Sequence, residues 1–345
     1  MKLYLLEVNF SQRLNNQITS VFILSMYESG MEIKKRTWDI LRFLIGISII
    51  SLLILKLGAA EVVDVISSMN LYIVLLVIIS LLLTIFLYAA IIKILTEGLG
   101  EEIGITDSLR YYLPSHALGL LTPGRVGRLS LLYFLKKNKI SYGVTLAVLV
   151  LERLVAYITL SAIAIYGFFI FFERDTALKV TFYLLLFLLI LGLLIKSEKI
   201  RKIIQDFVLG KYAEKFEGFY RNLEFLVKVK KTILALTFFL SFARLALAAF
   251  VKYLMFLYFN VNVSFFDVLV ISSISGLTAL IPISISGLGV RESSAVYLFY
   301  KIGVDPAISG GIFLFVTIMR YVTASIILGI YSKEIKNIKI LLWLS

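Results

Sequence analysis

The stretch Ile281-Pro-Ile-Ser-Ile-Ser-Gly-Leu-Gly-Val-Arg-Glu292 breaks an apolar region with a proline, two serines, two glycines and a pair of opposite charges. A similar break, Thr122-Pro-Gly-Arg-Val-Gly-Arg128, lies in the other half of the chain. Proline lacks an N–H group and clashes with the preceding turn, and glycine loses more backbone freedom on folding than other residues. Each break is therefore expected to interrupt a helix inside an apolar region.

The whole chain is far more apolar than a soluble domain. Of its 345 residues, 60% are hydrophobic and 17% are charged, and the mean hydropathy is +0.96. Soluble proteins are about 45–50% apolar and about 25% charged. The chain has no cysteine and one histidine, which excludes disulfide frameworks and Cys/His zinc clusters. We therefore expect an integral membrane protein without a metal or cofactor.

Apolar segments suited to crossing a bilayer, each needing about 20 mainly apolar residues, recur along the chain. The predicted full spans are 41–57, 71–95, 143–172, 180–195, 232–259 and 307–331. Two further stretches, 105–122 and 266–285, are broken by Gly, Ser and Pro and are expected to be re-entrant helical hairpins. The predicted fold is an all-α polytopic membrane protein with about six full spans and two re-entrant hairpins.

The distribution of Lys and Arg predicts the orientation, because short loops rich in these residues stay in the cytoplasm. If the two broken stretches crossed the membrane, the basic loop 123–139 would lie outside while 31–42 lay inside. If each stretch returns to its own side, all the strong basic clusters face the cytoplasm. They lie in 31–42, 123–139, 196–231 and 333–345. We therefore expect a multi-pass protein of the cell membrane with cytoplasmic N- and C-termini.

This orientation makes the two broken stretches enter from opposite sides, so the chain divides into an inverted repeat. The halves are about 71–172 and 232–331. A short echo accompanies them, with Gly-Arg-Val-Gly-Arg ending at Arg128 and Gly-Leu-Gly-Val-Arg ending at Arg291. Gly- or Pro-interrupted helices at matching positions of inverted halves are typical of transporter binding sites.

Other segments fall outside the two halves. Residues 1–30 lack the apolar core and cleavage site of a signal peptide. They are expected to be an interfacial helix or an extension upstream of a true start at Met31. The segment 180–195 and the basic loop 196–231 join the halves, and the loop is expected to be an amphipathic surface helix or hairpin. Residues 332–345 are expected to be a cytoplasmic tail.

A few charges lie inside or beside the apolar segments, where each costs about 2.5–3.5 kcal/mol on insertion scales. Such charges persist mainly when they pair with one another or line a wet cavity. Those beside the breaks or inside spans include Glu152, Arg153, Arg244, Arg320, Arg125, Arg128, Arg291 and Glu292. Lys252 lies near the outer end of its span, so we expect its ammonium group to reach the interface, and we assign it no role.

The breaks offer backbone N–H groups at half-helix ends, which bind anions, and arginine adds bidentate recognition of phosphate. We predict that Arg153, Arg320 and Arg291 contact a phosphate or carboxylate. Glu152 and Glu292 would orient them or hold a coupling cation. The wider predicted binding site adds Arg125, Arg128, Gly287, Gly289 and Pro282. The alternative is a set of buried ion pairs that only fix helix register.

His116 lies near Pro114 in the first broken stretch, and we expect a hydrogen-bonded structural imidazole rather than an acid or base. Ser115, Ser284 and Ser286 are expected to line and cap the broken helices. The sequence has no G-x-S-x-G elbow, nucleotide phosphate loop, H-E-x-x-H motif or Asp-x-Asp pair. We therefore do not expect an enzyme. The alternative is a membrane-embedded transferase or an accessory subunit in lipid or lipid-linked glycan assembly.

Four runs of residues carry a resemblance to a known family. They are Thr122-Pro-Gly-Arg-Val-Gly127, Leu151-Glu-Arg-Leu154, the stretch 281–292 and Arg320-Tyr321. Together they resemble the lysylphosphatidylglycerol synthase transmembrane region, a family of flippase-like membrane proteins that includes the membrane domain of the multiple peptide resistance factor. The resemblance covers about residues 35–331 and implies a flippase-like transmembrane domain over 31–331.

The chain departs from the family pattern at two places. Arg128 and Leu131 stand where the family often has Glu and then Arg. Val155 and Ala156 stand where an Asp commonly follows the Glu-Arg-Leu run. Both departures lie in the first half and concern its substrate rather than its fold.

The resemblance implies lipid translocation without lipid synthesis. In two-domain members a soluble domain transfers an aminoacyl group from tRNA to lipid, and the membrane domain moves the product. We expect this chain to translocate an anionic phospholipid or a polyprenyl-phosphate-linked lipid, downhill or coupled to an ion. The expected partners are that lipid and the membrane. The formal net charge of +13 suits anionic lipid headgroups rather than nucleic acid, and the oligomeric state is open.

Overall fold

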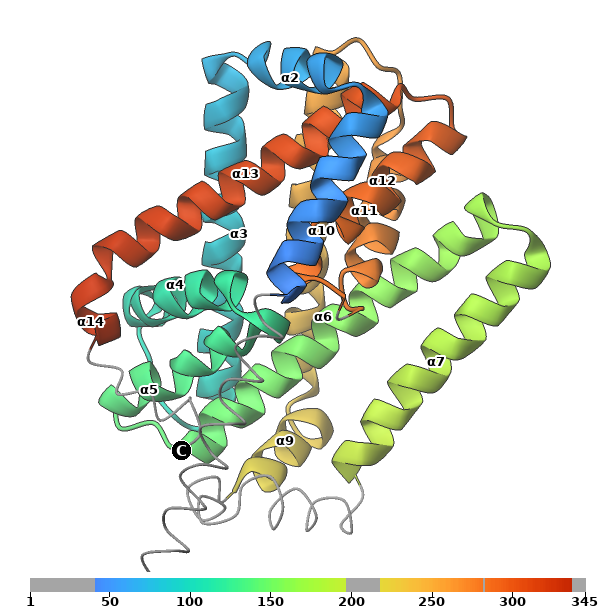
Figure 1. The fold of residues 1–345 in the computed structure, drawn as a ribbon. Coiled ribbons are helices and arrows are strands. Elements are labelled where there is room, and N and C mark those ends of the chain that lie inside the picture. Colours follow the sequence, from blue (N-terminus) through green and yellow to red (C-terminus); the bar gives the residue numbers. More distant parts are fainter. Residues whose placement is uncertain (1–40, 197–217, 282, 337–345) are drawn as a thin grey trace, which may run out of the picture. The chain divides into compact units, whose positions relative to one another are not determined.

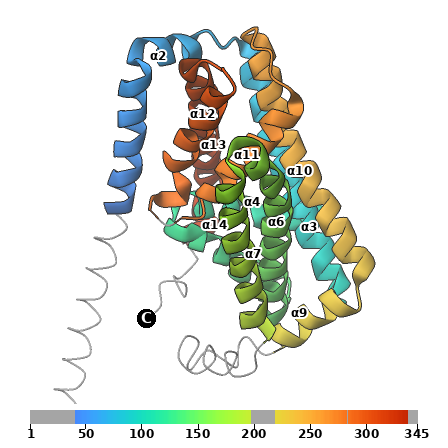
Figure 2. The same ribbon diagram turned by 90° about the vertical axis from the view of Figure 1, so that its right-hand side faces the viewer.

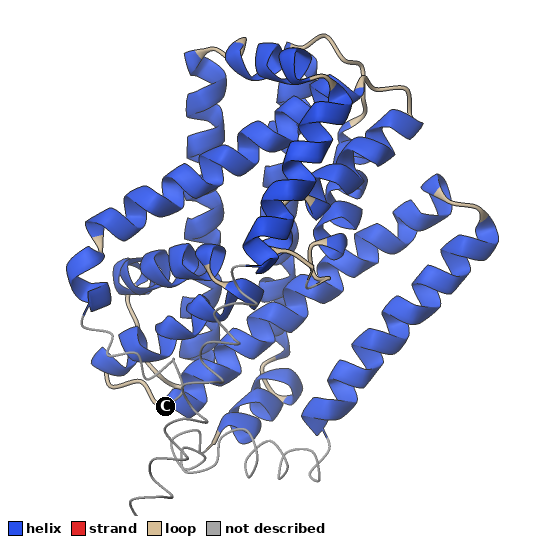
Figure 3. Ribbon diagram, in the orientation of Figure 1, coloured by secondary structure: helices blue, strands red, loops and turns tan. Residues whose placement is uncertain are grey.

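The computed structural model describes residues 41–196, 218–281 and 283–336 (Figure 1). Internal contacts divide the chain into Met1–Ile45 and Gly46–Ser345, and only the last five residues of the first unit are described. The described residues form helices and loops and no strand (Figure 3), which confirms the predicted all-α fold. The predictions for 1–30, for most of 196–231, for Pro282 and for the end of the tail fall outside these residues.

The first half runs from a long helix through a broken pair of short helices to another long helix. Its elements are α3 (Leu71–Gly98), α4 (Ile105–Leu121), the 3-10 turn η1 (Pro123–Leu129), α5 (Ser130–Lys137) and α6 (Tyr142–Phe171). We name α4, η1 and α5 the first hairpin, and η1 the first tip.

The second half repeats this order. Its elements are α10 (Lys231–Tyr258), α11 (Phe265–Thr278), the 3-10 turn η4 (Ile285–Gly287), α12 (Val290–Lys301) and α13 (Pro306–Ile330). We name α11, η4 and α12 the second hairpin, and residues 283–289 the second tip. The arms of each hairpin pack against each other or against the intervening turn.

Shorter or connecting helices flank the two halves. The helix Leu41–Leu57 bends by 96° into α2 (Ala59–Ser67). The helix α7 (Arg174–Lys196) follows the first half, and α9 (Phe219–Lys228) precedes the second. The chain described ends with α14 (Ser332–Lys336).

Four helices among the described residues are long and apolar enough to cross a membrane, namely α3, α6, α10 and α13. The bent pair of Leu41–Leu57 and α2 would make a fifth. The multi-pass membrane architecture is therefore confirmed, while six full spans stay a prediction. The first arms of the hairpins are shorter: at 1.5 Å per residue, α4 and α11 measure about 26 and 21 Å, below the ~30 Å hydrocarbon core.

The two halves run in opposite directions. In Figure 1 α3 descends from the α2 end, and α10 ascends from the α9 end; Figure 2 shows the same from the side. The two helices pack against each other. The first hairpin consequently lies in the lower part of the view and the second in the upper part. Two hairpins that start from opposite ends of an antiparallel pair are directed toward each other.

Local sequence starts these helices where the halves need them. Asn70 and Ser141 cap α3 and α6 by accepting the amide hydrogens of Ile73 and Val144, at 3.1 and 3.2 Å. Ser264 and Asp267 form a reciprocal capping box at the start of α11, which satisfies two amide groups that lack helical partners. In α13 proline occupies the first turn, where its missing N–H costs nothing.

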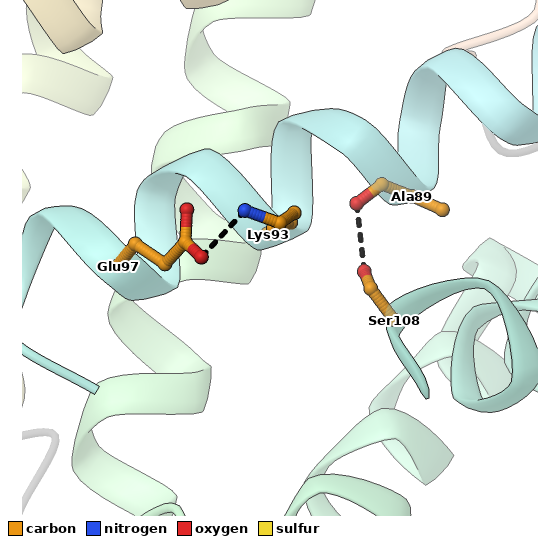
Figure 4. A network of polar contacts seen from close by, with 4 residues as sticks. All are labelled: Ala89, Lys93, Glu97 and Ser108. Carbon is orange, nitrogen blue, oxygen red and sulfur yellow. Dashed lines mark hydrogen bonds and ion pairs between the residues drawn. The ribbon is translucent and has the colours of Figure 1, made fainter. Parts of the chain in front are cut away.

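The buried side chains form two main apolar cores, one around each hairpin. The core of the first hairpin takes residues such as Leu131 and Ile140, and that of the second takes residues such as Ile271 and Phe299. The helices α3, α6 and α13 contribute buried residues to both cores, and α10 adds half-buried residues to the core of the first hairpin. Hydrogen bonds add to this packing: Ser108 of α4 donates to the Ala89 carbonyl of α3 at 2.7 Å (Figure 4).

Candidate functional site

The first tip is closed by one hydroxyl and one glycine. The Thr122 hydroxyl donates to the Leu118 carbonyl at 2.8 Å and accepts the Gly127 amide at 2.7 Å. A Cβ on Gly127 would lie 2.4 Å from the backbone carbon and oxygen of Leu118. Only glycine lets η1 approach α4 so closely. Arg125 at this tip has φ +59°, a left-handed conformation that is uncommon for arginine.

The second tip is closed in a similar way by Gly287, which has φ +78°. A Cβ on Gly287 would lie 2.3 Å from the Cβ of Ala279, so the tip also packs directly on its own first arm. Ser286 beside it has φ +54° and ψ +22°, again left-handed. The predicted site residues Gly287 and Gly289 therefore shape the backbone of the tip.

The two tips meet. The Ser286 hydroxyl of the second tip donates to the carbonyl of Leu120, at the end of α4, at 3.0 Å. The turns η1 and η4 are also in contact. The sequence breaks that interrupt the two halves thus come together at one place, although they lie far apart along the chain.

Three arginines gather around the ring of Tyr88 beside these tips. Their guanidinium carbons lie 3.6, 5.1 and 5.6 Å from the ring centre for Arg244, Arg128 and Arg153, respectively. They come from α10, η1 and α6, and Tyr88 comes from α3. Arg128 and Arg244 are 7% and 5% exposed. We call Tyr88 and these arginines the tyrosine-centred group; cation–π attraction to the ring face is its common interaction.

Glu152 is the carboxylate of this group and is only 1% exposed. One of its oxygens, Oε2, lies 2.9 Å from Nε of Arg153 and 3.8 Å from Nη1 of Arg128. Both nitrogens are buried and neither has a hydrogen-bonded partner, so neither contact is a hydrogen bond. The second oxygen, Oε1, also lacks one. These are close charge pairs rather than locked hydrogen-bonded pairs, so the arginine donors stay available.

A second group of cations lies around the tips. Arg125, Arg291 and Arg320 come from η1, α12 and α13, and each is close enough to another member for mutual electrostatic repulsion. Arg128 of the tyrosine-centred group also repels Arg125 and Arg320. We call these three the second arginine group. The two groups therefore adjoin at the first tip, which supplies a residue to each.

Glu292, which is 2% exposed, serves a different purpose from Glu152. Its Oε2 accepts the amide hydrogen of Gly289 at 2.8 Å, and its Oε1 accepts the hydroxyl hydrogen of Thr317 at 2.6 Å. It thereby caps α12 and ties the second tip to α13. Glu292 lies three residues after the helix-capping Gly289, the spacing at which a Glu carboxylate reaches back to the amide of the capping residue; this spacing was visible in the sequence.

The guanidinium groups present hydrogen-bond donors that no protein group accepts. Buried nitrogens without an acceptor occur in Arg128, Arg153, Arg244 and Arg291. An unsatisfied buried donor costs about 1–3 kcal/mol, and more when it is charged. Several such donors converging at one place are the expected surroundings of an anionic group. Within the described residues, no cluster of three or more His, Cys, Asp or Glu side chains could hold a metal ion.

A comparison with known families now adds to this geometry. The family described as the lysylphosphatidylglycerol synthase TM region matches residues 40–327. The chain belongs to this family. Both hairpins and all six arginines of the site lie inside the matched region, and membership gives the chain a membrane-lipid-related, flippase-like character. A search of curated proteins finds no match.

The position predicted from the sequence for Lys252 is wrong. Lys252 does not extend to the interface, because it is 2% exposed. Its ammonium group donates to the Ala248 carbonyl and the Ser272 hydroxyl at 2.9 and 3.2 Å, and lies 5.3 Å from the ring centre of Phe313. The position of Lys252 along its span did not indicate on which face of α10 it lies. That face packs against α11 and α13.

His116 and Ser115 have polar contacts within the first hairpin, whereas Ser284 has none. His116 lies 3.4 Å from the Tyr112 hydroxyl through Nδ1, and Ser115 accepts a hydrogen bond from Ser130 at 3.0 Å. The Ser284 hydroxyl is buried and has no hydrogen-bonded partner. His116 also packs beside Tyr88, so the edge of the tyrosine-centred group is formed by the first arm of the first hairpin.

Two residues of the site received no role from the sequence. Arg244 was recognisable as a charge inside an apolar span, and this signal alone pointed to it. Tyr88 carried no signal, because its ring is one among many in the apolar helices of this family member. Its role depends on α4, α6, α10 and the first tip all meeting α3 at this ring.

Proposed function

We propose that this protein moves a lipid with an anionic headgroup across the cell membrane. The observation that carries the proposal is the set of buried arginine donors without protein acceptors at the meeting point of the two hairpin tips. Phosphate is the anion that best fits these donors, because guanidinium groups bind its oxygens in a bidentate fashion. Family membership supports a lipid as the carrier of that phosphate.

The residues divide the work as follows. Arg153 and Arg320 lie on the long helices of opposite halves, and both would contact the anionic headgroup. Arg125 on the first tip and Arg291 in the first turn of α12, just after the second tip, would accompany it. Glu152 balances part of the arginine charge and keeps one oxygen without a partner, so it would orient Arg153 or hold a coupling cation. The acyl or prenyl chains would remain in the surrounding lipid while the headgroup crosses between the tips.

The antiparallel halves support movement from one leaflet to the other. The hairpins point toward each other, so a headgroup between the tips could be reached from either side when one hairpin withdraws. The predicted orientation, with cytoplasmic termini, gives the first hairpin the cytoplasmic side. The driving force would be the lipid gradient or an ion, since the sequence has no nucleotide phosphate loop.

Leaflet exchange in proteoliposomes tests this proposal. The purified protein should accelerate the loss of protection of a fluorescent anionic lipid against a membrane-impermeant quencher. Arg153→Ala and Arg320→Ala should each reduce the rate by about 100-fold or more, because a charge-assisted bidentate contact contributes about 3 kcal/mol. Arg174→Ala, at an exposed position at the start of α7, is the matched control and should keep the wild-type rate.

Two results would contradict the proposal. Unchanged exchange in both Arg153→Ala and Arg320→Ala would remove the assigned site. Conversion of the lipid headgroup in the presence of an activated donor, without leaflet exchange, would indicate a membrane-embedded transferase instead. Monodisperse elution of each variant in detergent would show that a lost rate is not a lost fold.

A further inference from the structure

The cations at the tips are more numerous than one phosphate requires. The two groups contain the six arginines 125, 128, 153, 244, 291 and 320. The carboxylates in contact with them or near them are Glu152 and Glu292, and Glu292 is already hydrogen-bonded through both oxygens. Like charges held together in a buried site repel one another more strongly than they would in water. A single phosphodiester, with one negative charge, would leave much of this repulsion in place.

The two groups of cations also come from different sets of elements. The tyrosine-centred group takes its arginines from η1, α6 and α10, whereas the second arginine group takes its arginines from η1, α12 and α13. Both groups contain buried nitrogens without an acceptor: Arg128, Arg153 and Arg244 in the first, and Arg291 in the second. Each group therefore has buried donors that an anion would satisfy, and the two groups adjoin at the first tip.

Tyr88 organises the first group for this purpose. A guanidinium that lies over an aromatic ring uses its flat face, so its N–H groups at the edge stay free to donate. Arg244 lies 3.6 Å from the ring centre and keeps an unpartnered Nε. The ring also partly offsets repulsion among the three arginines, because its face carries partial negative charge. Tyr88 is a positioning residue that presents three arginine edges together.

We infer that the site binds a headgroup with two phosphates, one at the tyrosine-centred group and one at the second arginine group. This inference rests on the proposed function and narrows its substrate class. Two lipid chemistries carry such a headgroup: a polyprenyl diphosphate, with adjacent phosphorus atoms, and a glycerol-bridged bisphosphate lipid. Both supply two negative charges, one for each group. Arg244 and Tyr88 then form part of the subsite for one of the two phosphates.

Paired lipids that differ by one phosphate test the inference. Phosphatidylcholine vesicles containing the protein receive one of two fluorescent sugar lipids with the same sugar and prenyl chain, linked by a monophosphate or by a diphosphate. A second pair compares phosphatidylglycerol with diphosphatidylglycerol. We expect the two-phosphate member of at least one pair to exchange about tenfold faster, which corresponds to about 1.4 kcal/mol. The pair that shows the preference identifies the source of the two phosphates.

Variants assign the preference to the two groups. Arg244→Gln and Arg320→Gln each remove one member of one group, and each should bring the ratio of the two rates close to one. Tyr88→Leu should reduce the ratio as Arg244→Gln does, because it removes the aromatic ring that the three guanidinium groups contact. Arg174→Gln is the matched control and should keep the wild-type ratio.

The outcomes separate this inference from the proposed function. Exchange of both members of each pair at equal rates, or faster exchange of the one-phosphate lipid, would overturn the two-phosphate headgroup and leave translocation intact. Absence of any exchange would contradict translocation, and native mass spectrometry would then decide the inference: wild-type protein offered equal amounts of both members should retain the two-phosphate lipid. Equal retention would overturn it.

Discussion

The two hairpins share a plan but differ in how their tips are held. The first tip is closed by a neutral hydroxyl, Thr122, and the carboxylate nearest to its arginines keeps an oxygen without a partner. The second tip is closed by the carboxylate of Glu292, which binds Gly289 and Thr317 through both oxygens. Related sequence breaks therefore produce one tip with available charges and one tip fixed to α13. The difference indicates that the first hairpin contributes more to binding and the second more to the frame.

The largest expected effect concerns the carboxylate that fixes the second tip. Glu292→Ala removes two charge-assisted hydrogen bonds, of roughly 2 kcal/mol each, so it should lower the free energy of unfolding by about 4 kcal/mol. Thr122→Val, which removes the two neutral hydrogen bonds of the hydroxyl that closes the first tip, should cost only about 2 kcal/mol. Denaturant titration of the detergent-solubilised variants measures both. Equal losses would erase the distinction between the tips.

The next effect concerns the glycines that let each tip approach its own first arm. Gly287→Ala places a Cβ 2.3 Å from the Cβ of Ala279 and requires a left-handed alanine, so it should cost about 3 kcal/mol. Gly127→Ala needs no left-handed backbone but places a Cβ against the Leu118 carbonyl and the Gly119 nitrogen, and about 2 kcal/mol is expected. The same titration measures both changes.

The matched control for the glycines is Gly303→Ala. Gly303 also has a positive φ, of +80°, but a Cβ there meets no atom within 4 Å. Its cost should be about 1 kcal/mol, from backbone conformation alone. If Gly303→Ala destabilises as strongly as Gly287→Ala, close packing of the second tip is not what requires its glycine.

The smallest effect concerns the bond that joins the tips. Ser286→Ala removes the hydrogen bond to the Leu120 carbonyl and should cost about 1 kcal/mol. Amide hydrogen exchange at the first tip should accelerate, since the end of α4 loses a partner. Ser294→Ala is the control, because that hydroxyl bonds with Thr278 and the Arg291 carbonyl, both within the second hairpin. Equal acceleration in both variants would show that the tips are not coupled through Ser286.

The sequence predicted the features that follow from local chemistry. Proline and glycine locate the two hairpin breaks, because they disrupt helices wherever they stand. Arg153, Arg320 and Arg291 stood out because a charge inside an apolar segment is costly. The structure places all three beside the tips, although the binding role predicted for them stays a prediction.

Features that depend on which helix faces are in contact escaped the sequence. Lys252 was placed at the interface from its position along α10, but its helix face packs on α11 and α13. The stacking of Arg244 on Tyr88 joins α10 to α3, and no spacing within either helix indicates it. Glu292 was predicted, like Glu152, to be a partner of arginine. Its hydrogen bond with Thr317 joins residues 25 positions apart, so no local pattern indicated it.

The hydrogen bond from Ser286 to Leu120 has a consequence for biosynthesis. The Leu120 carbonyl is among the last of α4 and has no amide partner further along its own helix. The donor that satisfies it is 166 residues later in the chain, and chains are made from the N-terminus at about 5–20 residues per second. The first hairpin therefore enters the membrane many seconds before its tip can be completed. During that interval lipid or water must serve the open end of α4, so membrane composition at the site of insertion bears on how efficiently this protein assembles.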